Sequence, residues 1–392
     1  MTQAMNTITN ATANMTTAIR EAIRDRYLAD ETRSVHALVE MAALSVETRQ
    51  QISDEAAKLI TRVRTSAKPS MMENFLAEYG LTTKEGVALM CLAEALLRVP
   101  DAETIDELIE DKIVPGKWQE HLGRSESALI NTSTWGLMVT GKLIAPTDEK
   151  GLSSTLRAMV KRMGEPVVRT AVKQSMKELG RQFVLGRTIE EATKNGKKQQ
   201  ARGYTYSYDM LGEAARTDAD ALRYHRAYSD AITKISSACT HDDIRKNPGI
   251  SVKLSALHPR YEFAKRESVM DVLVERTFQL ALMAKTANMG FNIDAEEADR
   301  LDLSLDVIEA VLAHPELAGW DGFGIVVQAF GPRAPFVLDW LYATAEKLDR
   351  KIMVRLVKGA YWDAEIKRAQ VMGLDGFPVY TRKVNTDVSY VA

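Results

Sequence analysis

The sequence ISVKL, at residues 250–254, is an apolar, β-branched run that contains one lysine, and four runs of similar character flank it. They are YTYSYDM (204–210), GFNID (290–294), GIVVQ (324–328) and MVRLV (353–357). Longer helical patterns, such as SVMDVLVERTFQLALMAKTA, separate these runs. Alternation of this kind predicts parallel βαβ units. No GxGxxG motif follows the first run, which argues against a Rossmann fold.

Each predicted strand delivers a polar residue at its carboxyl end, and the five are Asp209, Lys253, Asp294, Gln328 and Arg355. In a β/α barrel these strand ends meet at one mouth, where the chemistry takes place. A single polar strand end often only caps or pairs, but five in series favour a functional site. We therefore predict a (β/α)8-type, TIM-like barrel over residues 203–392. Because only five strands are visible and Ala392 interrupts a helical pattern, we expect this barrel to be truncated after about five strands.

The residues before 203 have a different character. We expect a disordered N-terminus at 1–16, a polar helical arm at 17–69 and an all-α domain at 70–202. Thr82 and Glu85 form a capping-box pattern, and Asp101 is a candidate N-cap. Apolar residues are sparse in the arm, so it should lean on another domain or subunit.

Composition excludes several classes of function. The chain has 392 residues, of which 45% are hydrophobic and 27% charged, and its net charge of −2 gives no general attraction to nucleic acid or anionic lipid. Cys91 and Cys239 lie far apart and suit buried thiols of a reducing compartment. The six histidines form no metal-ligand pattern, so we expect no metal site. The N-terminus lacks the apolar core of a secretory signal.

Lys253 has three possible roles on its apolar strand: a Schiff-base nucleophile, a carboxylate binder or a rim cation paired with a neighbour. Asp294, one strand further on, is its natural partner. The acidic residues that follow, Glu296, Glu297 and Asp299, are expected to solvate a helix start.

The densest group of chemically useful residues is MVRLVKGAYWDAEIKRAQ, residues 353–370. Gly359 permits close approach of the backbone, and a helix start just beyond it can hold a phosphate. Lysine, arginine and two aromatic residues around this turn suit a cofactor with a phosphate and a ring. The alternative is a solvated turn with core aromatics. Residues 380–383 (YTRK) could add phosphate contacts.

These motifs resemble a known family. The segments YSYDMLGEAA, GISVKLSALHPRY, NIDAEEADRL, GWDGFGIVVQAF, VRLVKGAYWDAEIKRAQ and PVYTRKVNTDVSY are similar to the proline dehydrogenase barrel of bacterial proline utilization A proteins. EGVALMCLAEALLRVPD and TWGLMVTGKL resemble the helical domain that precedes that barrel. The resemblance covers about residues 72–392, and the segment before it resembles the family's arm.

The resemblance implies FAD-dependent oxidation of L-proline to Δ1-pyrroline-5-carboxylate, with electrons passed to a membrane quinone. It implies that Lys253 binds the proline carboxylate, that Asp294 organises it and that Tyr361 covers the ring. Arg355 would contact the flavin near its reactive nitrogen, and Gln328 the ring edge. The other implied FAD contacts are Asp294, Val357, Lys358, Gly359, Ala360, Trp362, Thr381 and Lys383. Asp209, Met210 and Glu213 match the family's first-strand motif.

The resemblance also implies which parts of the protein lie outside this sequence and which partners the protein has. The last barrel strands, a histidine flavin contact, two substrate-binding arginines and an aldehyde dehydrogenase domain would fall beyond Ala392, so this piece alone should be inactive. No ribbon-helix-helix pattern is present, and we expect no specific DNA binding. We expect a cytoplasmic protein, peripheral at the inner face of the bacterial membrane, and homo-oligomers formed through the arm. Two rival hypotheses remain: a barrel enzyme that uses Lys253 as a Schiff base, and a non-catalytic fragment.

Overall fold

The computed structural model describes residues 15–66, 104 and 184–392. The chain divides into two compact units, one made of residues 1–49 and 186–392 and the other of residues 50–185. The expected caps at Thr82 and Asp101, and most of the expected all-α domain at 70–202, lie outside the described residues. The expected segment limits stay predictions.

A five-stranded parallel sheet forms the centre of the first unit, with the strands in sequential order. The strands of this described sheet are β1 Ser207–Asp209, β2 Gly249–Val252, β3 Gly290–Ile293, β4 Phe323–Gln328 and β5 Met353–Val357. Each overlaps the run that predicted it, and the α/β class is confirmed. A closed TIM-like barrel stays a prediction.

Strand register explains why residues far apart in sequence meet. The pairing of β2 through β5 places Lys253, Asp294, Val326 and Arg355 in one row across the sheet. Side chains of in-register residues on parallel strands point to the same face, because the side-chain period of a strand is two. One residue nearer the strand starts, the side chains of Val252, Ile293 and Ile325 point to the opposite face and belong to the hydrophobic core. Val354, the corresponding residue of β5, is 44% exposed.

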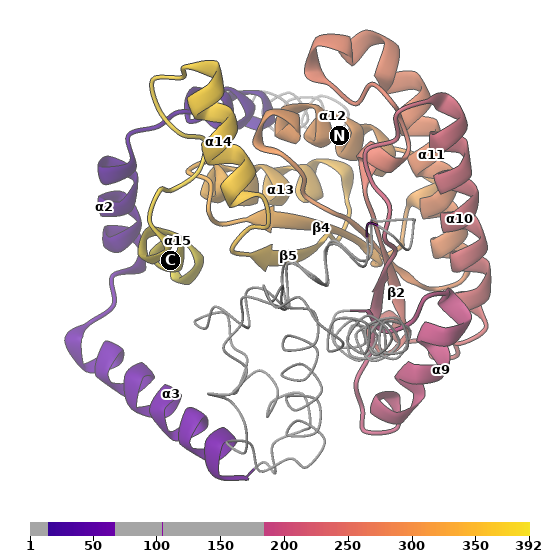
Figure 1. Cartoon of the computed structure of the whole chain (residues 1–392), viewed down its shortest axis with the longest axis horizontal. Coiled ribbons are helices and arrows are strands. Elements are labelled where there is room, and N and C mark those ends of the chain that lie inside the picture. Colours follow the sequence, from indigo (N-terminus) through magenta and orange to yellow (C-terminus); the bar gives the residue numbers. More distant parts are fainter. Residues whose placement is uncertain (1–14, 67–103, 105–183) are drawn as a thin grey trace, which may run out of the picture. The chain divides into compact units, whose positions relative to one another are not determined.

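Helices follow the strands (Figure 1). They are α10 Asp218–Ser236, α11 Arg266–Thr286, α12 Leu301–Leu312, α13 Ala334–Leu348, α14 Trp362–Met372 and α15 Lys383–Val391, with α9 Ile189–Gln200 before β1. Of these, α10 to α13 contribute side chains to the hydrophobic core behind the sheet. The start of α10 is fixed by a capping box in which Thr217 and Asp220 satisfy each other's backbone N–H groups. Fully buried Trp340, Phe291 and Phe323 lie in the core between the helices and the sheet.

The N-terminal arm begins with helical residues 15–25 and continues through α2 Glu31–Ala42 and α3 Val46–Ser66. Arg20 is 7% exposed and donates to Asp302 and Asp306 of α12, at 2.7 and 2.8 Å. A buried arginine held by two carboxylates ties the arm to the helices behind the sheet. Helix α2 buries Leu38 alone, which agrees with the sparse apolar pattern expected for the arm.

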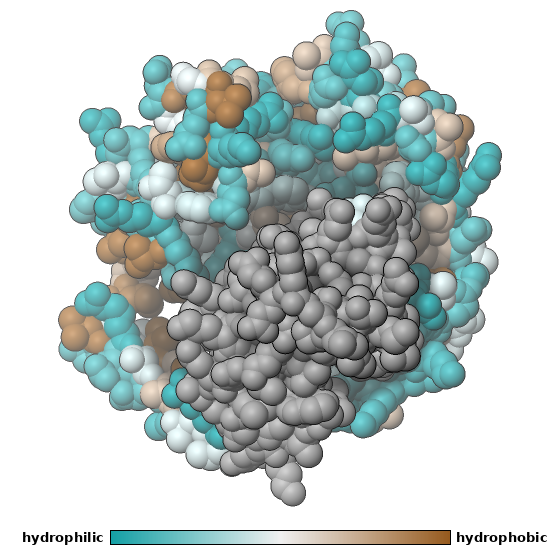
Figure 2. Space-filling view, viewed as in Figure 1, coloured by the Kyte–Doolittle hydropathy of each residue, from teal (hydrophilic) through white to brown (hydrophobic). Residues whose placement is uncertain are grey.

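Helix α3 differs from the rest of the arm because its side chains are exposed. Its exposed apolar residues include Val46, Ile52, Leu59 and Val63, and Figure 2 shows brown surface in this part of the chain. None of the described helices is both long enough and apolar enough to cross a bilayer.

Candidate active site

Lys253 lies at the centre of the candidate site, between two carboxylates. Its Nζ donates to Asp209 Oδ1 at 2.9 Å and to Asp294 Oδ2 at 3.0 Å. The lysine side chain is 16% exposed, Asp294 is 8% exposed and Asp209 is 51% exposed. The structure therefore brings together three of the residues predicted from strand ends.

Asp294 uses its second oxygen to hold the other cation of the row. Arg355 Nη2 donates to Asp294 Oδ1 at 2.6 Å, and Nη1 reaches Ser251 Oγ at 3.4 Å. The Arg355 side chain is 44% exposed. Part of its guanidinium group can therefore donate to an incoming ligand while Nη2 stays bonded to Asp294. A buried carboxylate thus fixes the separation of two cations from two different strands.

The charge on Lys253 follows from this geometry. Burial alone would lower the pKa of a lysine, but hydrogen bonds and attraction from Asp209 and Asp294 outweigh it and raise the pKa of Lys253. The Lys253 side chain therefore stays protonated and positively charged at neutral pH. It suits the binding of a carboxylate better than nucleophilic attack, which needs a neutral amine.

A second hydrogen-bond network joins Ser255 and Glu296, which stand two positions after Lys253 and Asp294 in the sequence. Glu296 is 9% exposed, and its carboxylate accepts from Ser255 N at 3.0 Å and from Ser255 Oγ. Ser255 Oγ also accepts from Ala214 N at 3.0 Å, in the loop after β1. Ala214 has φ +51°, a strained value for an L residue, so this hydrogen bond helps to hold the loop.

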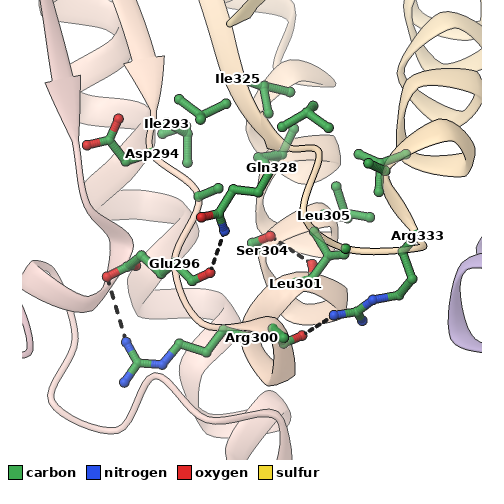
Figure 3. A pocket seen from close by; sticks show the side chains of 18 of the residues that line it. Ile293, Asp294, Glu296, Arg300, Leu301, Ser304, Leu305, Ile325, Gln328 and Arg333 are labelled. Atoms are coloured by element: carbon green, nitrogen blue, oxygen red, sulfur yellow. Dashed lines mark hydrogen bonds and ion pairs between the residues drawn. The ribbon is translucent and has the colours of Figure 1, made fainter. Parts of the chain in front are cut away.

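Gln328 continues the same network to the last two strands. Its Nε2 donates to the backbone oxygen of Glu296 at 2.9 Å, and its Oε1 accepts from Ala360 N at 3.1 Å. Asp294, Glu296 and Gln328 all line one pocket, and Figure 3 shows Gln328 bonded to Glu296 within it. The loops after all five described strands are therefore joined by hydrogen bonds through Ser255, Glu296 and Gln328.

The role expected for Glu296 was wrong. It does not solvate a helix start, because α12 begins at Leu301 and the Glu296 side chain is buried against Ser255. Ser255 was missed as well. The signal available was position, since both residues stand two places after a strand-end charge, but the acidic run EEAD resembles a solvated surface.

The chain turns after β5 at Gly359, as expected for the predicted cofactor-binding segment. Gly359 has φ +133°, which an L residue rarely adopts, and a Cβ there would collide with the ring of Phe330. Tyr361 is the N-cap residue of α14, as predicted, and Trp362 Nε1 donates to the Tyr380 carbonyl at 2.7 Å. Burial, followed by the charges of Glu213 and Glu296, raises the pKa of Tyr361, so its hydroxyl stays protonated.

Two lysines expected to contact phosphate converge on one carboxylate. Lys358 Nζ and Lys383 Nζ donate to Asp387 at 2.5 and 3.0 Å. Asp387 was not predicted, although it stands four residues after Lys383 on α15. Thr381 points to Glu31 of the arm and not to the ion row around Lys253.

The remaining predicted residues lie around the rim. Val357 ends β5, Met210 packs against the core just after β1, and Glu213 is exposed in the loop that follows. Among residues 15–66 and 184–392, no group of three His, Cys, Asp or Glu side chains is arranged to hold a metal ion.

Glu296 predicts a pH dependence of stability. Burial raises its pKa to about 7 although hydrogen bonds from Ser255 oppose the shift; the charges that face it are Arg300, at 3.7 Å, and Glu297. Its folded pKa exceeds its unfolded value, so its stabilising contribution is complete below the unfolded pKa and is lost as pH rises through about 7. The stability of Glu296→Gln relative to the native chain should therefore rise between about pH 5 and pH 8, by on the order of 3 kcal/mol.

Urea denaturation at several pH values measures this difference. Glu297→Gln, at the more exposed neighbouring carboxyl, is the matched control. A difference between the native chain and Glu296→Gln that stays constant over this pH range contradicts the account.

Comparison with known proteins identifies the family. The model for proline dehydrogenase matches residues 192–392, more than half of the chain. The chain belongs to the proline dehydrogenase family. Two further models match the residues before it: the N-terminal domain of proline utilization A proline dehydrogenase at 17–64, and the DNA-binding domain of proline dehydrogenase at 71–183.

Individual proteins of similar sequence are named PutA or proline dehydrogenase, in agreement with this family. The bifunctional protein PutA of Escherichia coli is 50% identical over 377 residues, which is 95% of this chain and 29% of that protein. The proline dehydrogenase of Deinococcus radiodurans is 26% identical over 196 residues, which is 50% of this chain and 57% of that protein. A crystal structure of a Bradyrhizobium japonicum proline utilization A variant is 48% identical with a TM-score of 0.65, and covers 93% of this chain and 36% of its own. The chain thus spans about three tenths of the length of the PutA relative.

Proposed function

We propose that this proline dehydrogenase family member oxidises L-proline to Δ1-pyrroline-5-carboxylate. The observation that carries the proposal is the row of Lys253, Asp294 and Arg355, in which a buried carboxylate just after β3 holds two cations, one just after β2 and one in the middle of β5. We further propose that the parallel sheet is part of a (β/α)8 barrel, since its strands follow in sequential order and its polar residues gather at one rim.

The substrate would be bound through its charges. Lys253 would bind the carboxylate of proline, and Asp294 would keep the ammonium group of Lys253 in place. Oxidation removes a hydride from a ring carbon and a proton from the ring nitrogen, so the residues must hold the ring still and exclude water. Tyr361, with its raised pKa, would cover the ring as a neutral phenol.

The cofactor would be FAD, which accepts the hydride when bound. The residues present fit it. Lys358 and Lys383 converge within bonding distance of one anionic group, and the exposed guanidinium of Arg355 can stabilise the negative charge that a reduced flavin ring carries. Gln328 would contact the ring edge, and the remaining contacts would come from Val357, Gly359, Ala360, Trp362 and Thr381.

The raised pKa of Lys253 disfavours the rival Schiff-base reaction. A lysine that attacks a carbonyl is activated by a lowered pKa, and two carboxylates within 3.0 Å have the opposite effect. Borohydride should therefore trap no covalent adduct on Lys253 with carbonyl compounds.

Further properties of the whole protein are proposed from the family resemblance of its sequence motifs. We propose a membrane quinone as electron acceptor, oligomers formed through the arm and a cytoplasmic location at the membrane face. We also propose a fused aldehyde dehydrogenase domain, which agrees with the bifunctional PutA relatives. The absence of specific DNA binding stays a prediction. The family description of residues 71–183 points the other way, and a gel-shift assay at physiological salt decides between them.

The proposed reaction is tested by incubating the whole protein, of which this chain is expected to be a part, with L-proline and a soluble quinone. The expected result is reduction of the quinone and a product two hydrogen atoms lighter than proline, with D-proline much less active. If a substrate of another class reduces the quinone and L-proline does not, the proposal is rejected.

A further inference from the structure

A residue from the arm binds the residue that precedes the N-cap of helix α15, and we call this contact the Glu31 cap. Arg382, the N-cap residue of α15, makes no side-chain capping hydrogen bond. Instead, the two carboxylate oxygens of Glu31 accept from Thr381 N at 3.0 and 3.1 Å, and one of them accepts from Thr381 Oγ1 at 2.8 Å. Asn385 Nδ2 donates to the same carboxylate at 2.5 Å. These contacts bridge about 350 residues of sequence, and Figure 1 shows α2 beside α15.

The Glu31 carboxylate lies at the start of α15, where a negative charge interacts favourably with the helix dipole. It accepts from the backbone N–H of Thr381, which precedes the N-cap residue, and from the side chain of Asn385 in the first turn. Partial burial opposes it, but hydrogen bonds from Asn385 and Thr381 lower the pKa of Glu31, so the cap is charged at neutral pH.

The capped turn carries residues that the proposed function needs. Thr381 and Lys383 belong to it, and Asp387, one turn further on, holds both Lys383 and Lys358. Lys358 comes from the turn after β5, so Asp387 links α15 to the other half of the proposed FAD site. A shift in the first turn of α15 would therefore move contacts on both elements.

Glu31 is itself held firmly on the arm side. Asp30 caps α2 by accepting from Arg33 N at 2.7 Å. Just before it, the guanidinium of Arg333 lies 4.9 Å from the ring centre of Tyr27. Together with the buried Arg20, these contacts fix the arm to helices that pack on the sheet.

We propose that Glu31 is a positioning residue for the cofactor-contacting turn at the start of α15. Through it, the arm orders one side of the FAD site although Glu31 itself touches no reacting atom. The inference rests on the proposed function for the identity of the ligand, but the capping contact does not depend on it.

Two measurements on Glu31→Ala test the proposal. Hydrogen exchange of the flavin-free chain should show faster exchange at residues 381–386. Titration of flavin-free protein with FAD, followed by flavin fluorescence, should show a dissociation constant about 3- to 10-fold higher. Glu31→Gln keeps one oxygen acceptor and should fall between Glu31→Ala and the native chain.

Matched variants separate a local effect from a general one. Glu40→Ala makes the same change at an exposed position of the same helix and should leave both measurements unchanged. Asn385→Ala should weaken FAD binding through the same contact, so the double variant with Glu31→Ala should be no worse than Glu31→Ala alone.

Three results would overturn the inference: unchanged exchange at residues 381–386, faster exchange with unchanged FAD affinity, or tighter FAD binding by Glu31→Ala. The second would make Glu31 a purely structural cap, and the third would make it a competitor of the cofactor. If the whole native protein binds no FAD, the proposed function fails with the positioning role, while the exchange data still report whether Glu31 holds the start of α15.

Discussion

Lys253→Met should lower kcat/KM for L-proline by about 2–4 kcal/mol of transition-state binding, which is roughly 30- to 1,000-fold. The KM for proline should rise strongly, because the variant loses the cation proposed to bind the carboxylate of the substrate. Asp294, only 8% exposed, would also lose one of its two cationic partners. Bound FAD should change little, since Lys253 is proposed to contact substrate. Steady-state kinetics together with flavin content measure both effects.

Lys351→Met is the matched control. Its lysine is 80% exposed and pairs with Asp321 at the surface, so the same substitution should leave proline kinetics unchanged. Unaltered proline kinetics in Lys253→Met would remove Lys253 from the site.

Asp294→Asn should cause the largest combined loss of stability and activity. The variant keeps the shape of the side chain but removes the charge that holds Lys253 and Arg355 at 3.0 and 2.6 Å. Breaking a buried pair costs about 3–5 kcal/mol, but Arg355 is 44% exposed and water can replace part of the interaction. We expect a loss of about 2–3 kcal/mol in the free energy of unfolding, and a fall of about 100-fold or more in kcat/KM, as positioning errors at a reacting centre produce.

Asp209→Asn tests whether burial determines how much an ion pair with Lys253 contributes to stability. Asp209 binds the same lysine at a similar distance, but it is 51% exposed. Its loss should cost less than about 1 kcal/mol of stability, measured by urea denaturation. Equal destabilisation by the two substitutions would show that burial does not determine the strength of these ion pairs.

Strand-level features could be predicted from the sequence because they depend on local patterns. The alternation of β-branched runs with helical segments located all five described strands, and the polar residues expected at strand ends included Asp209, Lys253 and Asp294 of the ion cluster. The strand-end position expected for Arg355 was wrong, because β5 continues to Val357, yet its side chain still reaches Asp294. Lys253 and Asp294 could be paired in advance because parallel strands bring their carboxyl ends to one edge. The turn at Gly359 could be predicted because its positive φ favours glycine.

Contacts between distant elements could not be predicted in this way. Glu296 resembles the solvated start of a helix, and only the tertiary structure shows that Ser255 lies against it. Glu31 resembles an ordinary first-turn acidic residue of α2, yet it also caps another helix. Neither contact has a sequence period, since both depend on how loops and the arm fold over the sheet.

The most direct test of the central claim is the visible spectrum of the purified whole protein with FAD, recorded without oxygen before and after addition of L-proline. The account predicts an oxidised-flavin band that L-proline bleaches, and bleaching that becomes much weaker in Lys253→Met although that variant holds the same amount of flavin. A flavin band that proline leaves unchanged, in protein that dithionite can still reduce, would contradict it.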